Sequence, residues 1–171
     1  AKAASRHTAE AACFPHGSPS RRGIITATIP AMRIGGTWFQ SRYGIHVNDG
    51  STVSGCTVTS SALHGIQVTT ACRVTENLCH KNGLGVASAA GILVSSSFNR
   101  IEANQVSGNT RGIDVQAGGN LIIKNHGADN PPGGGGADYI FTASNTFGPT
   151  TNLVGAGGVI TNVNPWANFS F

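Results

Sequence analysis

The chain has 171 residues, enough for one domain with a core, and 39% of them are hydrophobic. Only 11% are charged and the formal net charge is +4, without the basic stripe and interleaved aromatics that nucleic-acid binding requires. No apolar run is long enough to span a bilayer, so neither nucleic acid nor membrane is expected as a partner. The 24 glycines and many small polar residues favour turns over helices and predict an all-β protein.

Residues 1–22 show no periodicity of two or 3.6, so this segment is expected to be poorly ordered or to form a cap. It lacks the apolar core of a signal peptide, and the chain begins without Met, which suggests a mature, truncated or fragmentary piece. Trp38 and Phe39 precede the first clear repeat and are expected to cover its open end.

A four-residue pattern, G-I-x-V, occurs four times at intervals of 21, 26 and 21 residues. A second apolar column runs in step with it, and Cys or Asn follows that column three residues later. Two columns in register define a repeat, here extending over residues 23–128. The members are Gly44, Gly65, Gly91 and Gly112 in the first column, Val53, Val74, Ile101 and Ile122 in the second, and Cys56, Asn77, Asn104 and Asn125 after it.

Alternation within each short strand directs Ile and Val to one face, which a single turn of about 21 residues cannot bury alone. Stacked turns, called coils below, bury it, with equivalent residues about 4.8 Å apart. Asn77, Asn104 and Asn125 are therefore predicted to form a structural ladder of buried amides. Asn109 is expected on the surface, so Asn104→Leu should destabilise the fold more than Asn109→Leu.

The repeat is interrupted twice. The 26-residue interval carries about five extra residues within 81–90, which predicts a loop at a turn. Residues 129–137 contain two prolines and four consecutive glycines and are predicted to be a hinge. The aromatic tail that follows, residues 138–171, is expected to cap the solenoid or to contact a second copy.

The pattern G-I-x-V with [VI]-x-x-N resembles the right-handed parallel β-helix of the pectin-lyase-like superfamily, over about residues 44–127. The C-terminal segment also resembles the ends of uncharacterised bacterial β-helix repeat proteins. The resemblance implies a solenoid of four to five coils with a non-repetitive tail, an extracellular or cell-surface location, and contact with polysaccharides. Some members are polysaccharide lyases, hydrolases or epimerases, and others, including trimeric phage tailspikes, are adhesive rods, so a homo-oligomer, a trimer by analogy, is expected.

Two columns are candidate ligand-binding positions. The outward column between Ile and Val reads His46, Gln67, Leu93 and Asp114, and is expected to form a mixed solvent face. His46 and Asp114 are three coils apart, about 14 Å, which is too far for a catalytic pair. The column before it reads Tyr43, His64, Ala90 and Arg111, where Tyr43 and His64 are interpreted as either a simple surface stack or a sugar-stacking platform.

Glu76 and Glu102, one coil apart and followed by Lys124, are the best carboxylate pair, but charges on a solenoid surface usually serve solubility. The four cysteines lack metal-binding spacing, which favours buried free thiols and leaves a disulfide between coils open. No metal or cofactor is therefore expected. The leading hypothesis is a non-catalytic, self-associating structural or adhesion module that binds glycans; the alternative is a polysaccharide lyase or glycoside hydrolase.

Overall fold

The computed structural model describes residues 24–25, 28–29, 42–130, 137–142, 144–153 and 163–171, and every regular element in them is a β-strand. The expectations for residues 1–22, for Trp38 and Phe39 and for the centre of the hinge lie outside the described residues.

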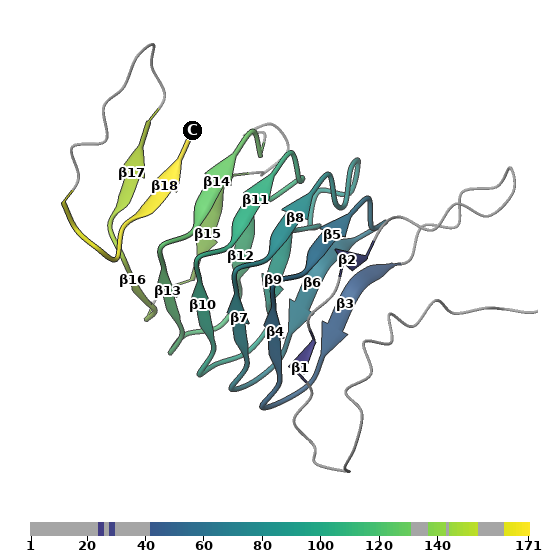
Figure 1. Cartoon of the computed structure of the whole chain (residues 1–171), viewed down its shortest axis with the longest axis horizontal. Helices are drawn as coiled ribbons and strands as arrows, with labels where there is room; N and C mark the ends of the chain where they lie inside the picture. The colour runs from purple at the N-terminus through teal and green to yellow at the C-terminus, as the bar shows by residue number, and fades with distance from the viewer. Residues whose placement is uncertain (1–23, 26–27, 30–41, 131–136, 143, 154–162) are drawn as a thin grey trace, which may run out of the picture.

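Four consecutive coils contain three short strands each (Figure 1). The first has β3 (Tyr43–Val47), β4 (Thr52–Ser54) and β5 (Thr57–Thr59), and the second has β6 (His64–Val68), β7 (Arg73–Thr75) and β8 (Leu78–His80). The third has β9 (Ile92–Val94), β10 (Arg100–Glu102) and β11 (Gln105–Ser107), and the fourth has β12 (Ile113–Val115), β13 (Leu121–Ile123) and β14 (His126–Ala128). Before them lie β1 (Ile24–Ile25) and β2 (Thr28–Ile29).

Equivalent strands pair in parallel and form three sheets, which confirms the predicted parallel β-helix. After the four coils lie β15 (Tyr139–Phe141), β16 (Thr146–Phe147), β17 (Thr150–Asn152) and β18 (Asn168–Ser170). Sheet A has the order β1-β4-β7-β10-β13-β16, sheet B β17-β18-β14-β11-β8-β5-β2, and sheet C β15-β12-β9-β6-β3. Ile66 pairs with Ile92 and Ile92 with Ile113, and all three are fully buried. The repeated isoleucine therefore builds one continuous core column, as the alternation predicts.

Asn77, Asn104 and Asn125 lie in one ladder at the corner between sheets A and B. The side-chain oxygen of Asn104 accepts hydrogen bonds from the backbone N–H and Nδ2 of Asn77, at 3.0 and 2.9 Å. In the same way, the side-chain oxygen of Asn125 accepts hydrogen bonds from the backbone N–H and Nδ2 of Asn104. Each rung thus supplies the acceptor that the backbone of the preceding coil lacks at the bend, where an unpaired N–H would be costly.

The structure contains two further ladders that the sequence analysis missed. Asn82, Asn109 and Asn130 bond in the same way at the corner between sheets B and C, and Asn99, Asn120 and Asn145 do so between sheets C and A. The expectation that Asn109 lies on the surface is wrong, because it is fully buried and its Nδ2 donates to the Cys79 carbonyl at 3.0 Å.

Each of the nine ladder asparagines named so far directly follows a residue with a left-handed backbone. At the corner between sheets C and A, the left-handed column reads Gly50, Ala71, Phe98, Gly119 and Ser144, with φ between 55° and 76°. The left-handed residue turns the chain, and the asparagine after it reaches inward to bond the next coil. Each of these corners therefore depends on two consecutive residues, the left-handed residue and the asparagine that follows it.

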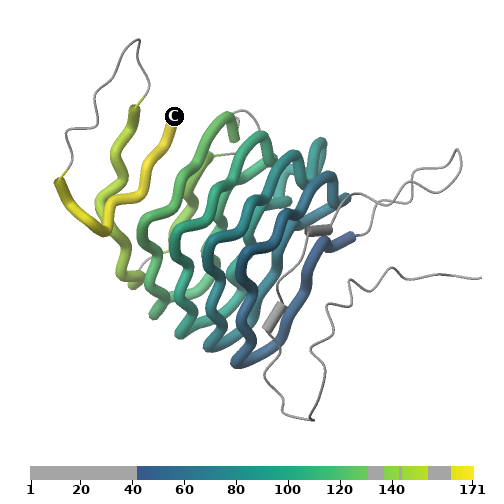
Figure 2. Tube along the Cα trace, viewed as in Figure 1, coloured from purple at the N-terminus to yellow at the C-terminus, as the bar shows by residue number. Residues whose placement is uncertain are grey.

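Sheet B ends in an unexpected strand order. β15 (Tyr139–Phe141) extends sheet C and β16 (Thr146–Phe147) extends sheet A, but β17 (Thr150–Asn152) does not pair with β14. Instead β18 (Asn168–Ser170) lies between β14 and β17 and pairs in parallel with both. Figure 2 shows this C-terminal strand, in yellow, beside the last complete coil. The C-terminal segment therefore continues the stack.

Candidate functional site

The outward face of sheet A carries a cluster of opposite charges. Glu102 accepts a hydrogen bond from Arg100 Nε at 2.7 Å and one from Lys124 Nζ at 3.1 Å. Lys124 Nζ also lies 4.8 Å from the centroid of the Trp166 ring, within cation–π distance. Arg100, Glu102 and Lys124 thus form one ion network that spans the third and fourth coils.

The two carboxylates proposed as weak catalytic candidates do not share an environment. The hydrogen bond from Arg100, together with Lys124, holds the pKa of Glu102 below its usual range, so this side chain is an anion. Glu76 is exposed at the neighbouring corner, with φ +59°, and has no ion pair among those found in the described residues. A lowered pKa is the opposite of what a general acid in glycoside hydrolysis needs.

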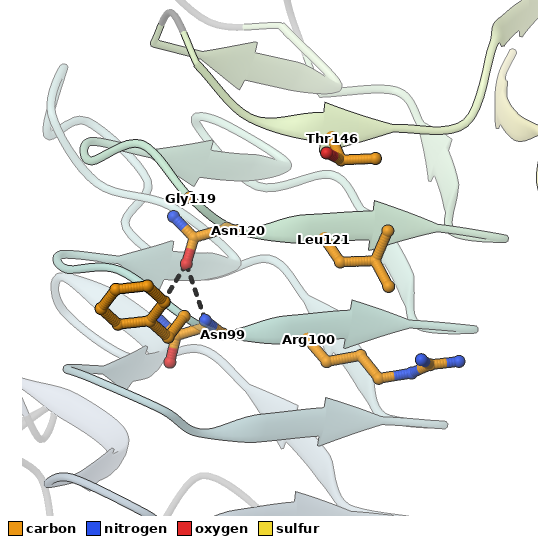
Figure 3. A pocket seen from close by; sticks show the side chains of 7 residues that line it. Asn99, Arg100, Gly119, Asn120, Leu121 and Thr146 are labelled. Atoms are coloured by element: carbon orange, nitrogen blue, oxygen red, sulfur yellow. Dashed lines mark hydrogen bonds between the residues drawn. The ribbon is translucent and has the colours of Figure 1, made fainter.

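Beside this network lies an open groove of about 500 Å³. Arg100, Leu121 and Thr146 stand at the same position of three successive strands and lie in a row in Figure 3. The buried amides of Asn99 and Asn120 close the corner end, joined by a 3.0 Å hydrogen bond. The remaining lining residues are Phe98 and Gly119.

Phe98 is a large apolar residue of the groove that is strongly exposed, with 76% of its surface accessible. Sequence reasoning did not single out Phe98, Arg100, Leu121 or Thr146. Phe98 directly precedes the ladder residue Asn99, whereas the equivalent residues of the other coils are Gly, Ala or Ser. This contrast is the sequence signal that could have identified Phe98. That signal becomes visible once the ladder of Asn99 is known.

Tyr43 and His64 do stack on sheet C. Their ring centroids are 5.8 Å apart and their planes differ by 14°, while the Arg42 guanidinium lies 5.6 Å from the Tyr43 ring centroid and His46 lies 5.4 Å from it on the same strand. His64 is 6% exposed, and its Nδ1 accepts the Ala90 N–H at 3.0 Å. Burial lowers the pKa of His64, so the ring is neutral and its Nδ1 lone pair is occupied.

The expectation that the column His46, Gln67, Leu93 and Asp114 faces solvent is wrong for its last two members. Leu93 is 5% exposed and Asp114 2%, and Arg111 pairs with the Asp114 carboxylate at 2.6 Å. His46 is exposed and Gln67 is half-buried. Two buried atoms of this cluster, Gln67 Oε1 and Arg111 Nε, have no hydrogen-bond partner within the described part of the chain.

The described residues contain no group of three or more His, Cys, Asp or Glu side chains that could hold a metal ion. Cys56, Cys72 and Cys79 are buried thiols outside any disulfide, as the cysteine spacing favours. Burial strongly raises the pKa of Cys79, which keeps it protonated and unreactive. No helix among the described residues has the length and apolarity to cross a membrane.

Three parallel sheets, a column of stacked isoleucines and three asparagine ladders define this chain as a parallel β-helix protein. It belongs to the family described as periplasmic copper-binding protein (NosD), whose model matches residues 16–167. No curated protein and no solved structure matches the chain.

Proposed function

We propose that this chain is a non-catalytic β-helix module that binds a glycan across the outer face of sheet A. The observation that carries the proposal is the open groove beside Arg100, Leu121 and Thr146, with the exposed ring of Phe98 at its corner end. Sugar rings offer both apolar C–H faces and hydroxyl groups, and this lining offers an aromatic ring, an aliphatic side chain and polar groups.

The corner that leads to the groove supports the same proposal. The Asp49 carboxylate accepts hydrogen bonds from the Thr69 hydroxyl at 2.6 Å and from the Thr70 N–H at 3.1 Å. The Thr70 hydroxyl in turn donates to the Ser96 hydroxyl at 3.2 Å. These hydrogen-bonded side chains extend over three coils, and the last of them, Ser96, lies two residues before Phe98 in sequence. Such groups can exchange hydrogen bonds with a sugar as readily as with water.

A polysaccharide lyase or hydrolase is the alternative that the fold resemblance raises, since the parallel β-helix carries several chemistries. The anionic state of Glu102 and its two cationic partners favour a binding role over acid catalysis. Incubation with polygalacturonate and alginate separates the two functions. We expect no unsaturated or reducing product; product that is lost in Glu102→Gln or Glu76→Gln would establish the enzyme.

The family name raises copper as a ligand. Copper favours imidazole, thiolate and thioether ligands. In the described residues, the thiols of Cys56 and Cys72 donate to the backbone carbonyls of Ser54 and Asn48, and the Nδ1 of His64 is already bonded. The described residues also bring no three His, Cys, Asp or Glu side chains together as a ligand set, so the proposed function does not involve a copper centre.

The family is described as periplasmic, so we place the proposed function outside the cytoplasm. Self-association at the C-terminal end is part of the proposal. Phe147, Trp166 and Phe171 are each about half exposed there, at 50, 48 and 49%, and apolar surface of this kind favours contact with a second copy. Light scattering of the full chain tests self-association. We expect an oligomer, a trimer by analogy with related β-helix proteins, and a monomer at all concentrations would refute self-association.

A glycan array probed with the purified chain tests the binding function. We expect binding to a limited set of oligosaccharides that weakens in Arg100→Gln and Thr146→Val, because both residues line the groove. Leu84→Ala is the matched control, since Leu84 is 62% exposed on the loop between β8 and β9, outside the lining. An array without any bound glycan would refute the proposal.

A further inference from the structure

Phe98 places an exposed aromatic ring at a corner where the rest of its column has small residues. Its backbone is left-handed, with φ +64°, a conformation that bulky side chains rarely adopt. The other members of its column are Gly50, Ala71, Gly119 and Ser144, all small. Because its side chain is 76% exposed, packing offsets little of the conformational cost. The corner explains the left-handed backbone, which Glu76, Lys81 and Lys124 share at the other corners. It does not explain an exposed aromatic ring in a column of small residues, which we interpret as a sign of function.

The backbone of Phe98 is held rigidly in this conformation. Its N–H donates to the Gly119 carbonyl at 3.1 Å, and the next residue, Asn99, is 2% exposed. Asn99 Nδ2 donates to the Thr69 carbonyl at 2.7 Å and to the Asn120 side-chain oxygen at 3.0 Å. The corner thus presents the aromatic ring at a fixed place, which lowers the entropy lost when a ligand binds.

Gly119, one coil further along, leaves the ring uncovered on its groove side. A β-carbon at this position would lie 4.0 Å from Phe98 Cε1, so any larger side chain would meet the ring. Gly119 has φ +76°, where glycine is also the least strained residue. The coil above Phe98 therefore leaves open the face on which a planar or ring-shaped ligand would rest.

The groove floor carries one charged side chain, and its charge is balanced. Arg100 is 42% exposed and is paired with Glu102 at 2.7 Å. Lys124, the second cation on Glu102, lies against the Trp166 ring and outside the lining, so the lining itself carries no unpaired charge. Leu121 is half-buried and apolar, and Thr146 offers an exposed hydroxyl. This balance favours an uncharged ligand that has an apolar face and hydroxyl groups.

We infer that Phe98 is a stacking platform for one pyranose ring of an uncharged oligosaccharide. The apolar C–H face of the ring lies against Phe98 and Leu121, while Arg100 and Thr146 exchange hydrogen bonds with its hydroxyls. This inference rests on the proposed glycan-binding function and specifies the residue and the class of glycan.

Isothermal titration calorimetry with cellohexaose, mannohexaose, xylohexaose and chitohexaose, compared with hexagalacturonate, tests the inference. We expect at least one uncharged hexasaccharide to bind more tightly than the acidic one. Phe98→Gly should weaken that binding roughly tenfold, because it removes the stacking face, and should leave the melting temperature unchanged or higher. Phe98→Ser, which introduces the residue found at the equivalent position Ser144, is a second variant and should weaken binding in the same way. Arg73→Gln, one coil earlier in the column of Arg100, is the control and should bind as the wild type.

The outcomes separate the two levels of the proposal. Unchanged affinity in both Phe98 variants, with glycan binding intact, overturns the platform and leaves the glycan-binding function standing. Binding of hexagalacturonate alone, when lost in Phe98→Gly, overturns the uncharged ligand class. Absence of binding to every oligosaccharide overturns both the inference and the proposed function.

Discussion

The side-chain oxygen of Asn168 accepts hydrogen bonds from the backbone N–H and the Nδ2 of Asn125, 43 residues earlier, at 3.0 and 3.1 Å. The last rung of the ladder therefore comes from the C-terminal strand. The strand that follows in sequence, β17, carries Thr150 at this position, in register with Asn168. A threonine has no amide to continue the ladder, which gives a physical reason for the strand order.

Asn168→Ala should lower the free energy of unfolding by about 1–3 kcal/mol, because it leaves the buried N–H of Asn125 without an acceptor. Urea denaturation followed by circular dichroism measures this change. Asn48→Ala is the control, since Asn48 is exposed, and should be nearly neutral. Equal stability of the two variants would contradict the role of Asn168 as a rung.

Asn104→Leu and Asn109→Leu should destabilise the fold to a similar extent, on the order of 3 kcal/mol each, because both remove a buried rung. The sequence-based expectation of a milder effect at Asn109 fails once its burial is known. Thermal melting of both variants, beside Asn48→Leu, checks this. A near-neutral Asn109→Leu would show that the second ladder contributes little.

Glu102→Gln should cost at most about 1 kcal/mol at pH 7, because Arg100 and Lys124 are 42 and 41% exposed and solvent screens the pairs. The pKa of Glu102 is lower in the folded state, so its contribution is present above the unfolded pKa of about 4.3 and is lost as the pH falls through the folded pKa. Denaturation at pH 7 and pH 3, with Glu76→Gln as control, measures it. A gap between wild type and Glu102→Gln that persists at pH 3 would refute the ionic origin.

His64 should make the fold less stable in mild acid. Burial lowers its pKa in the folded state, although Asp114 opposes the shift, so the unfolded chain binds a proton first. Stability is full above about pH 6.5 and falls as the pH drops toward the folded pKa. His64→Asn places an amide oxygen near the Nδ1 position as an acceptor for Ala90 and should flatten the melting temperature between pH 7.5 and 5.

His46→Asn serves as the matched control for His64→Asn, because His46 lies exposed on the adjacent strand of the same sheet. It should keep the pH dependence of the wild type. Identical pH profiles for wild type and His64→Asn would assign the acid sensitivity to other groups.

The architecture could be predicted from sequence because its signal is local and repeated. Ile66, Ile92 and Ile113 recur in one frame, and alternation alone identifies their buried face. Asn109 was misplaced because a polar turn residue and a buried rung have the same sequence appearance. What distinguishes them is the left-handed residue before the rung, here Gly108, whose conformation no single sequence specifies.

The candidate site was harder to predict because it depends on contacts between coils. Asp114 reads as an outward residue, but burial and its pairing with Arg111 remove it from solvent. Phe98 reads as an ordinary hydrophobic residue, and only the corner geometry shows that it is exposed. Strand alternation gives the direction of a side chain but not what covers it.

The position of β18 between β14 and β17 also sets an order for folding during synthesis. The coils from β3 to β14 can stack one after another as they leave the ribosome, since each pairs with the coil before it. The next layer of sheet B has to wait until residues 168–170 emerge, after β17 is already outside. In this layer of sheet B the order of synthesis and the order of stacking are therefore reversed, because β18 is made after β17 but pairs directly with β14.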